Sequence, residues 1–280
     1  MRIGFKMPLC LIDDEEVQVS SILDASFRFS GERTQNVNNE VYEERLFKLI
    51  ASHGRSLKQA EVSGCVCVLL PQLSDKTLLK KIMLEISSAL GGHPSTNIYL
   101  YPYGQASFLM ALGRIERELV SSRPTWVLGF NAKNDDVNGS RSSVVAAKCE
   151  PCKGGLFSRN VCVDLDATQQ SIAVEKVLQQ LGLNCKYPVS DFTVSVEGEE
   201  PIWMHHIQSF SPWITSDTRY HFLNVKLGSL GACCGILKAV CLYQQQLNEA
   251  SERFHAVQLD IEPSGYVVGA LFGRNESENS

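Results

Sequence analysis

The chain has 280 residues, of which 44% are hydrophobic and 20% charged, a balance typical of a folded globular protein and not of a disordered one. Its net charge of -5 at pH 7 argues against a broad phosphate-binding surface, so we expect no nucleic acid partner. No run of about 18 apolar residues occurs, and the first segment carries Arg2, Lys6 and Pro8. We therefore expect neither a signal peptide nor a membrane span, and a cytoplasmic location.

Extended and helical patterns alternate along the first half of the chain. Continuous apolar runs predict strands, and apolar residues that recur every three or four positions predict helices. The expected strands cover Arg2–Ile12, Gly64–Leu70, Asn97–Tyr101 and Thr125–Phe130, and the expected helices cover Asn39–Ala51, Asp75–Leu90 and Gln105–Ser121. A tight turn at Tyr103 and Gly104 should join the third strand to the third helix.

Segment 133–143 is rich in Asn, Asp, Gly and Ser, which predicts a loop. We place a boundary there, between an N-terminal half of residues 1–143 and a C-terminal half of residues 144–280. Beyond it, strands are expected at Val144–Ala146, Val161–Leu165, Asp191–Val196, Phe222–Val225, Ala256–Ile261 and Tyr266–Phe272, and helices at Ser171–Leu181, Ile202–Phe210 and Gly231–Glu249. Short strands alternating with helices predict an α/β fold: two similar βαβ-containing halves with mixed sheets, in one layered unit.

The segment Tyr103–Leu112 reads Tyr-Gly-Gln-Ala-Ser-Phe-Leu-Met-Ala-Leu. It resembles the nucleophile segment of the ketoacyl synthases, members of the thiolase superfamily. In that family a cysteine follows a sharp turn and opens a helix, whose N-H groups and dipole stabilise a thiolate. The matching residue here is Gln105, so the resemblance implies a thiolase-like fold without the nucleophile.

A second segment, Leu227–Gly235, resembles the family's glycine-rich motif with a catalytic histidine. Alignment on Leu230, Gly231 and Ala232 places Gly228 at the histidine position and Ser229 after it. The family's other histidine follows the strand expected at Asp191–Val196, where Glu197 is the nearest substitute. The resemblance therefore implies that both catalytic histidines are absent.

Glutamine cannot form an acyl thioester. A glutamine at this position resembles the chain-length factors, the non-condensing partners of polyketide and polyene ketosynthases, and also decarboxylating ketosynthase-like domains, which retain their histidines. The resemblance implies a non-catalytic subunit that forms a heterodimer with an active ketosynthase, meets the acyl carrier protein through that complex and helps shape the acyl-chain tunnel. We expect no cofactor. The family's dimer joins strands near the nucleophile segment, so Asn97–Tyr101 is the expected interface strand, and the tunnel or interface candidates are Tyr99, Tyr101, Gln105, Phe108 and Ser229.

Two other functions stay open. One is a divergent acyltransferase, thioesterase or malonyl decarboxylase that uses Cys233, Cys234 or His205 in place of the missing residues. The other is a stand-alone acyl-binding or scaffold protein. His206 lies beside His205, and adjacent helical residues point about 100° apart, so the two should not share a face.

The ten cysteines are spread along the chain and lie mostly in apolar runs, so we expect reduced, buried thiols. Cys149-Glu150-Pro151-Cys152 forms one Cys-x-x-Cys motif. A zinc site would need two more ligands, such as Cys162 and Cys185, brought close by the fold. We favour an ordinary loop and expect no metal.

Overall fold

The computed structural model describes residues 1–24, 26–30, 41–73, 75–92, 96–165, 169–195, 201–248, 254–263 and 265–273. The strands of these residues form a six-stranded and a five-stranded sheet. The first sheet contains β1 (Ile3–Ile12), β2 (Glu15–Glu16), β3 (Cys65–Leu69), β4 (Asn97–Tyr101), β5 (Thr125–Asn131) and β6 (Ser143–Pro151). The second contains β7 (Phe157–Asp164), β8 (Asp191–Thr193), β9 (Arg219–His221), β10 (His255–Ile261) and β11 (Val267–Gly273).

The two sheets have the same topology. Apart from the short β2, the first sheet has the order β1-β6-β5-β3-β4 and the second the order β7-β11-β10-β8-β9. In each sheet, the last strand of the half is antiparallel to both of its neighbours; this strand is β6 in the first sheet and β11 in the second. The remaining pairs are parallel. The expected pair of similar halves with mixed sheets is confirmed.

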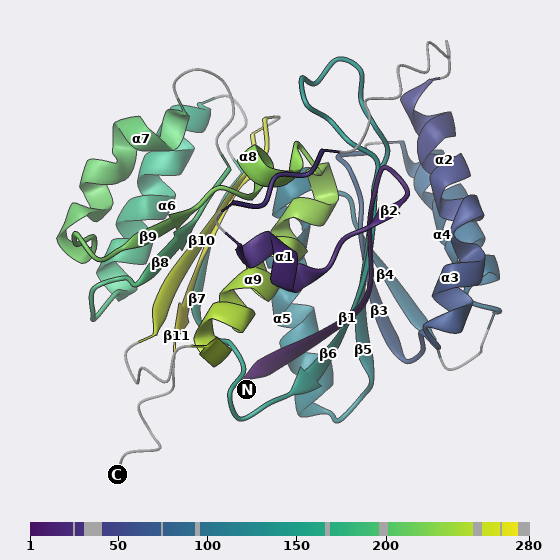
Figure 1. Ribbon diagram of the computed structural model, residues 1–280, viewed down its shortest axis with the longest axis horizontal. Coiled ribbons are helices and arrows are strands. Elements are labelled where there is room, and N and C mark those ends of the chain that lie inside the picture. Colours follow the sequence, from purple (N-terminus) through teal and green to yellow (C-terminus); the bar gives the residue numbers. More distant parts are fainter. Residues whose placement is uncertain are drawn as a thin grey trace.

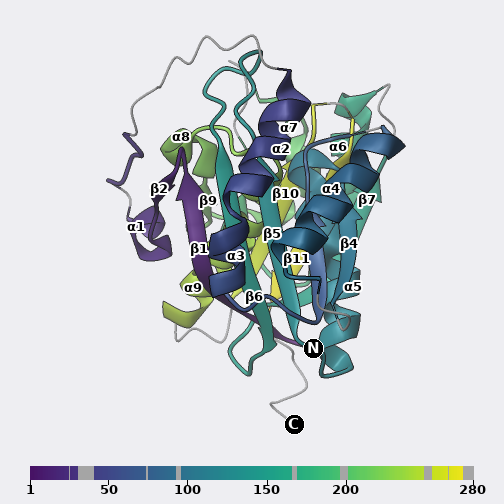
Figure 2. The same ribbon diagram turned by 90° about the vertical axis from the view of Figure 1, so that its right-hand side faces the viewer.

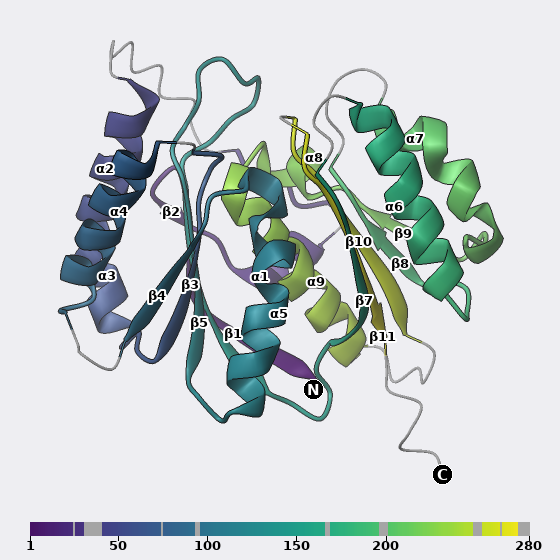
Figure 3. The same cartoon turned by 180° about the vertical axis from the view of Figure 1, so that it is seen from behind.

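The helices and sheets form five layers (Figure 1). α5 (Ser107–Val120) and α9 (Cys234–Asn248) lie between the sheets. The outer face of the first sheet is covered by α2 (Tyr42–Ser52), α3 (Gly54–Gln59) and α4 (Lys76–Ala89), as Figure 2 shows. α6 (Gln170–Asn184) and α7 (Ile202–His206) cover the outer face of the second sheet. Figure 3 shows this arrangement with the molecule seen from behind.

The short elements complete the connections. These are α1 (Val19–Leu23), α8 (Leu223–Leu227) and the 3-10 turns η1 (Gly104–Ala106), η2 (Ile207–Trp213) and η3 (Gly231–Cys233). η1 leads from β4 into α5, and η3 leads into α9 at the equivalent point of the second half. The two central helices thus begin in the same way.

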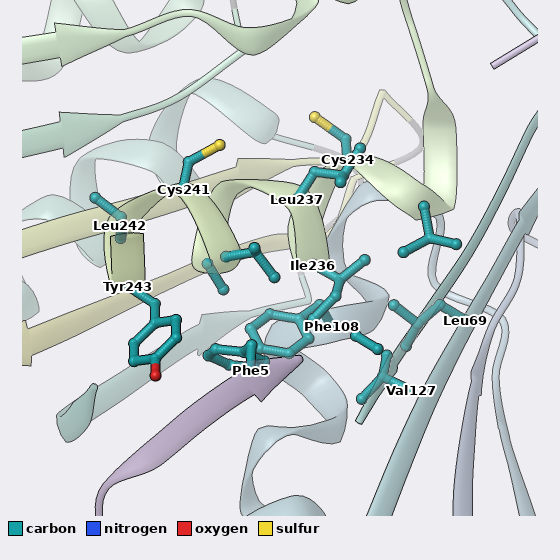
Figure 4. Packing of buried hydrophobic residues seen from close by; sticks show 14 of the residues in the cluster. Phe5, Leu69, Phe108, Val127, Cys234, Ile236, Leu237, Cys241, Leu242 and Tyr243 are labelled. Atoms are coloured by element: carbon teal, nitrogen blue, oxygen red, sulfur yellow. The ribbon is translucent and has the colours of Figure 1, made fainter. Parts of the chain in front are cut away.

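Burial follows the strand period of two. In β3, Cys65 and Cys67 face the central layer, whereas Val66 and Val68 pack under the outer helices. Within the central layer, the Phe108 ring of α5 lies beside the Phe5 ring of β1, as Figure 4 shows. The two ring centroids are 6.2 Å apart. A strand buried on both faces needs a continuous apolar run, which explains why β3 could be predicted.

One expected strand needs correction. The strand expected at Phe222–Val225 is wrong: β9 ends at His221, and the next residues form α8, whose Leu223 and Leu227 are both buried at helical spacing. The expected division between residues 143 and 144 stays a prediction, and it would fall after the first residue of β6. Strand order instead favours a division in the turn 152–156, which we adopt as a proposal.

Candidate functional site

Gln105 stands at the start of a central helix, as the sequence predicts. The chain leaves β4, turns at Gly104 and enters η1 and then α5. Gly104 has a φ of +56°, and a Cβ at this residue would lie 2.0 Å from Glu262 Oε2. Glycine is therefore required both by the backbone and by the approach of Glu262.

Two polar residues from the second half hold Gln105, whose exposure is only 4%. The Gln105 N-H donates to Glu262 Oε2 at 2.7 Å, and the Ser195 hydroxyl donates to Gln105 Oε1 at 2.8 Å. Ser195 follows β8 and Glu262 follows β10, which are parallel neighbours. Their carboxyl ends meet at one edge of the sheet, which is where ligand sites form in α/β folds.

The Glu262 carboxylate changes what this helix terminus can do. Free N-H groups at a helix start attract anions and can stabilise an oxyanion beside a nucleophile. At Gln105 that N-H already has an anionic acceptor from its own chain. A substrate oxyanion would have to displace Glu262, and a thiolate on residue 105 would meet a negative charge.

The start of α9 repeats this arrangement without the charge. Gly231 has a φ of +47°, and a Cβ there would lie 2.0 Å from Asn131 Oδ1. Asn131 ends β5, the fourth strand of the first half, just as Glu262 follows the fourth strand of the second half. η1 and η3 contact each other. Each central helix therefore begins against a polar side chain from the opposite half.

A small hollow reaches Ser195. Its volume is about 170 Å³, and it is lined by Gln170, Ser195, Pro201, Ile202, Trp203, Ile261 and Pro263. Sites for whole small molecules usually measure about 300–1,000 Å³. The hollow, as its described lining residues define it, is therefore smaller than such sites.

Of the two predicted histidine-equivalent positions, the structure describes Gly228. Gly228 caps α8 with a φ of +84°, and a Cβ there would lie 2.7 Å from the Gly139 carbonyl oxygen. A histidine could not simply replace it. Ser229 pairs with the same loop, since its N-H donates to Gly139 O at 2.9 Å. Glu197 lies outside the described residues.

The two cysteines expected as substitute nucleophiles are buried, and the expected histidine lies away from Gln105. Burial raises the pKa of Cys233 to about 12, so it stays a thiol at neutral pH. Cys234 is buried, with its Sγ 3.8 Å from Ser195 Oγ. His205 is exposed on α7, and His206 contacts Ser171 of α6. Both histidines belong to the outer layer.

The cysteines of the Cys-x-x-Cys motif and their predicted co-ligands are separated. Cys149 lies within β6 and packs in the central core, so it is not part of a loop as expected. Cys162 and Cys185 belong to the core under α6. In the part of the chain that the structure describes, no group of three or more His, Cys, Asp or Glu side chains is placed to hold a metal ion.

β4 forms an edge of the first sheet and pairs, among the described strands, with β3 alone. Its Tyr99 and Tyr101 are half-buried, and burial raises the pKa of Tyr101 to about 12. Beside it lies an apolar depression of about 730 Å³, the β4 hollow, lined by Leu79, Lys80, Met83, Leu84, Ile98, Tyr99, Leu100 and Tyr101. Phe108 is different: it is fully buried against Phe5, so it is not available to a partner.

Sequence reasoning missed a buried ion pair behind the site. Lys238 of α9 and Asp260 of β10 are both fully buried, with Nζ and Oδ1 2.8 Å apart. Gln258 donates to Asp260 Oδ2 at 2.7 Å and to the Gly235 carbonyl at 3.0 Å. A Cβ at Gly235 would lie 2.8 Å from the Gln105 carbonyl oxygen. The network thus fixes α9 to β10 where α9 approaches α5.

Comparison with known proteins depends on structure. No family model and no curated protein sequence matches the chain. Among solved structures, the chain is similar to the ketosynthase from module 1 of the bacillaene synthase of Bacillus amyloliquefaciens FZB42, at a TM-score of 0.58 and 12% identity over 98% of this chain and 76% of that one. The ishigamide ketosynthase/chain length factor gives a TM-score of 0.57 and 13% identity over 84% and 85% of the two chains.

A third similar structure, described as the acyltransferase ChlB3, gives a TM-score of 0.55 and 11% identity over 98% of each chain. At such identities the likeness concerns the fold and not the chemistry. Among the described residues, no helix is both long and apolar enough to cross a membrane. The strand order, the two central helices and these structural matches lead to one conclusion: the chain has the thiolase-like fold of the ketosynthases.

Proposed function

We propose that the chain is a non-catalytic, chain-length-factor-type subunit that pairs with an active ketosynthase and helps shape its acyl-chain tunnel. The observation that carries the proposal is the hydrogen bond from the Gln105 N-H to the Glu262 carboxylate. Condensation needs a nucleophile and free donors for the developing oxyanion. This chain has a side-chain amide at the nucleophile position, and the backbone N-H of the same residue already donates to the Glu262 carboxylate.

The β4 edge supports the pairing. An unpaired strand edge beside an apolar surface favours association with another chain. Leu84 lines the β4 hollow and is 71% exposed. We assign the interface to β4 and this hollow, with Tyr99 and Tyr101 as the residues that line the contact with the partner. Gln105, at the end of the same connection, is the proposed tunnel residue of this chain.

Co-purification with a ketosynthase that keeps its cysteine and both histidines tests the pairing. Leu84→Lys should weaken the complex at least about tenfold, since a charge would be desolvated in the apolar contact. Leu183→Lys is the matched control, because Leu183 is 86% exposed on α6, in the opposite outer layer. A chain that stays monomeric with every ketosynthase offered, or equal effects of the two variants, would refute the proposed pairing.

Mass spectrometry separates the proposal from the enzyme alternatives. The isolated chain incubated with malonyl- and acyl-loaded carrier protein should gain no covalent acyl group and release no carbon dioxide. Addition of the chain to the ketosynthase should change product length. An acyl adduct on Cys233 or Cys234 would instead favour the acyltransferase or thioesterase, and carbon dioxide release by the chain alone would favour the decarboxylase.

A further inference from the structure

A third hollow, outside the site around Gln105, lies against the edge strand β9 and measures about 340 Å³. We call it the β9 hollow. Its apolar surface includes Ile22 of α1, Leu223 of α8 and Cys241 of α9, and its charged lining residues are Arg28, Arg219 and Lys226. In Figure 4, Cys241 points away from Phe5 and Phe108. The volume lies within the usual range for small-molecule sites, about 300–1,000 Å³.

The charge of this lining opposes that of the chain. The protein carries a net charge of -5, yet no acidic side chain is among the described residues that line the β9 hollow. Asp24 lies nearby, but its carboxylate accepts hydrogen bonds from the N-H and hydroxyl of Ser26. Cations gathered in a concave, partly apolar site attract and orient an anion.

Lys226 is the best-defined of these cations. Its Nζ donates to the backbone carbonyls of Ile22 and Asp24, both at 2.8 Å, and makes no ion pair with any residue the structure describes. Burial lowers the pKa of Lys226, and the positive charge of Arg28 acts in the same direction. An ammonium group has three donors, so one remains for a ligand.

The opposite side of the hollow is held rigid by a buried carboxylate. Asp191 is fully buried and accepts two hydrogen bonds from the Arg219 guanidinium, at 3.1 and 2.8 Å. Its Oδ1 also lies within hydrogen-bond distance of His221 Nε2, at 2.7 Å. Bidentate pairing fixes the plane of a guanidinium. Asp191 balances the charge of Arg219, so the electrostatic attraction of the site falls mainly to Lys226 and Arg28.

We propose that the β9 hollow binds an amphipathic anion, with a carboxylate or phosphate head at Lys226 and a short apolar tail against Ile22, Leu223 and Cys241. The apolar part contributes through burial, and the head through a charge-assisted hydrogen bond. This site does not depend on pairing with a ketosynthase. Its failure would leave the proposed function untouched, and the reverse also holds.

Calorimetric titration of the full chain with octanoate and with octyl phosphate tests the proposal, with octanol as the uncharged probe. Binding of either anion, but at least about tenfold weaker binding of octanol, is expected from the strength of hydrogen bonds to charged groups. The anion that binds more tightly identifies the head group. Lys226→Met should reduce this preference, whereas Lys58→Met, on the exposed face of α3, should leave it unchanged.

Two variants of one residue at the rim of the β9 hollow keep the test decisive if Lys226→Met fails to fold. Val225 lines the β9 hollow and is 54% exposed, so it tolerates polar substitution. Val225→Glu should weaken anion binding about tenfold relative to the isosteric Val225→Gln, because only the former adds a repelling charge. Equal affinities of these two variants, octanol binding as tight as octanoate, or no binding of either anion would overturn the proposal.

Discussion

A cysteine at position 105 should be a poor thiolate, because the Glu262 carboxylate lies beside it. The Gln105 N is 2.7 Å from Glu262 Oε2. Like charges about 4 Å apart repel by about 4 kcal/mol at the effective dielectric near a protein surface, which corresponds to about three pKa units. Glu262 is only half-buried, so solvent screening reduces the effect, and we expect an increase of about one to two units.

The matched comparison is Gln105→Cys against Gln105→Cys/Glu262→Gln. The glutamine amide can still accept the N-H of residue 105 but carries no charge. Burial of the thiol and the helix terminus act equally in both variants, so their difference isolates the carboxylate. The thiol pKa should therefore be about one to two units higher in the single variant than in the double variant.

Thiolate absorbance, recorded as a difference from the wild-type protein, follows the new cysteine across pH without requiring reagent access. The ten native cysteines cancel in the difference. A thiol in Gln105→Cys that titrates at or below its ordinary value with Glu262 intact would refute the reasoning. Indifference of its pKa to Glu262→Gln would refute it equally.

Three further variants test the surroundings by urea unfolding. Gly104→Ala should lower the unfolding free energy by at least about 2 kcal/mol, because of the φ of +56° and the clash with Glu262. Gly104→Ala/Glu262→Ala should recover the part of this loss that comes from the clash. If the double variant recovers no stability, the clash is contradicted. Lys238→Met should cost about 3–5 kcal/mol by leaving Asp260 unpaired. Burial raises the pKa of Asp260, so this cost should shrink as pH falls, and Lys238→Met/Asp260→Leu should regain most of it. At Asp191, burial raises the pKa, but the hydrogen bonds it accepts outweigh burial and lower it, so its stabilisation is present above about pH 4 and lost as pH falls through the native pKa. Asp191→Asn should therefore flatten the acid side of the stability curve, and an unchanged slope would contradict this.

The elements that could be predicted are those in which burial produces a local pattern of apolar residues along the sequence. The run Gly64–Leu70 is buried on both faces, and α4 shows its apolar residues at helical spacing with Asp75 capping the start. Phe222–Val225 misled because aromatic and β-branched residues favour strands. Tertiary burial of Leu223 and Leu227 overrides that preference and forms α8.

The residues that define the site could not be predicted from local patterns. Glu262 and Ser195 reach Gln105 across 157 and 90 positions of the chain. One signal was available for Glu262, since an acidic residue directly follows an expected strand, where side chains gather at the sheet edge. Its partner remained hidden, because the meeting of two halves is a property of the fold and not of either segment.

The repeated fold shows how the site at Gln105 differs from its counterpart at the start of α9. Gly104 and Gly231 begin the two central helices with the same backbone turn, and each accommodates a polar side chain from the other half. At Gly231 that side chain is the neutral amide of Asn131, whereas at Gly104 it is the carboxylate of Glu262. A carboxylate stabilises the helix start but also occupies the donor that an oxyanion needs. Acyl transfer at this position would therefore require removal of this charge as well as a nucleophile, and Gln105→Cys alone should leave the chain inactive.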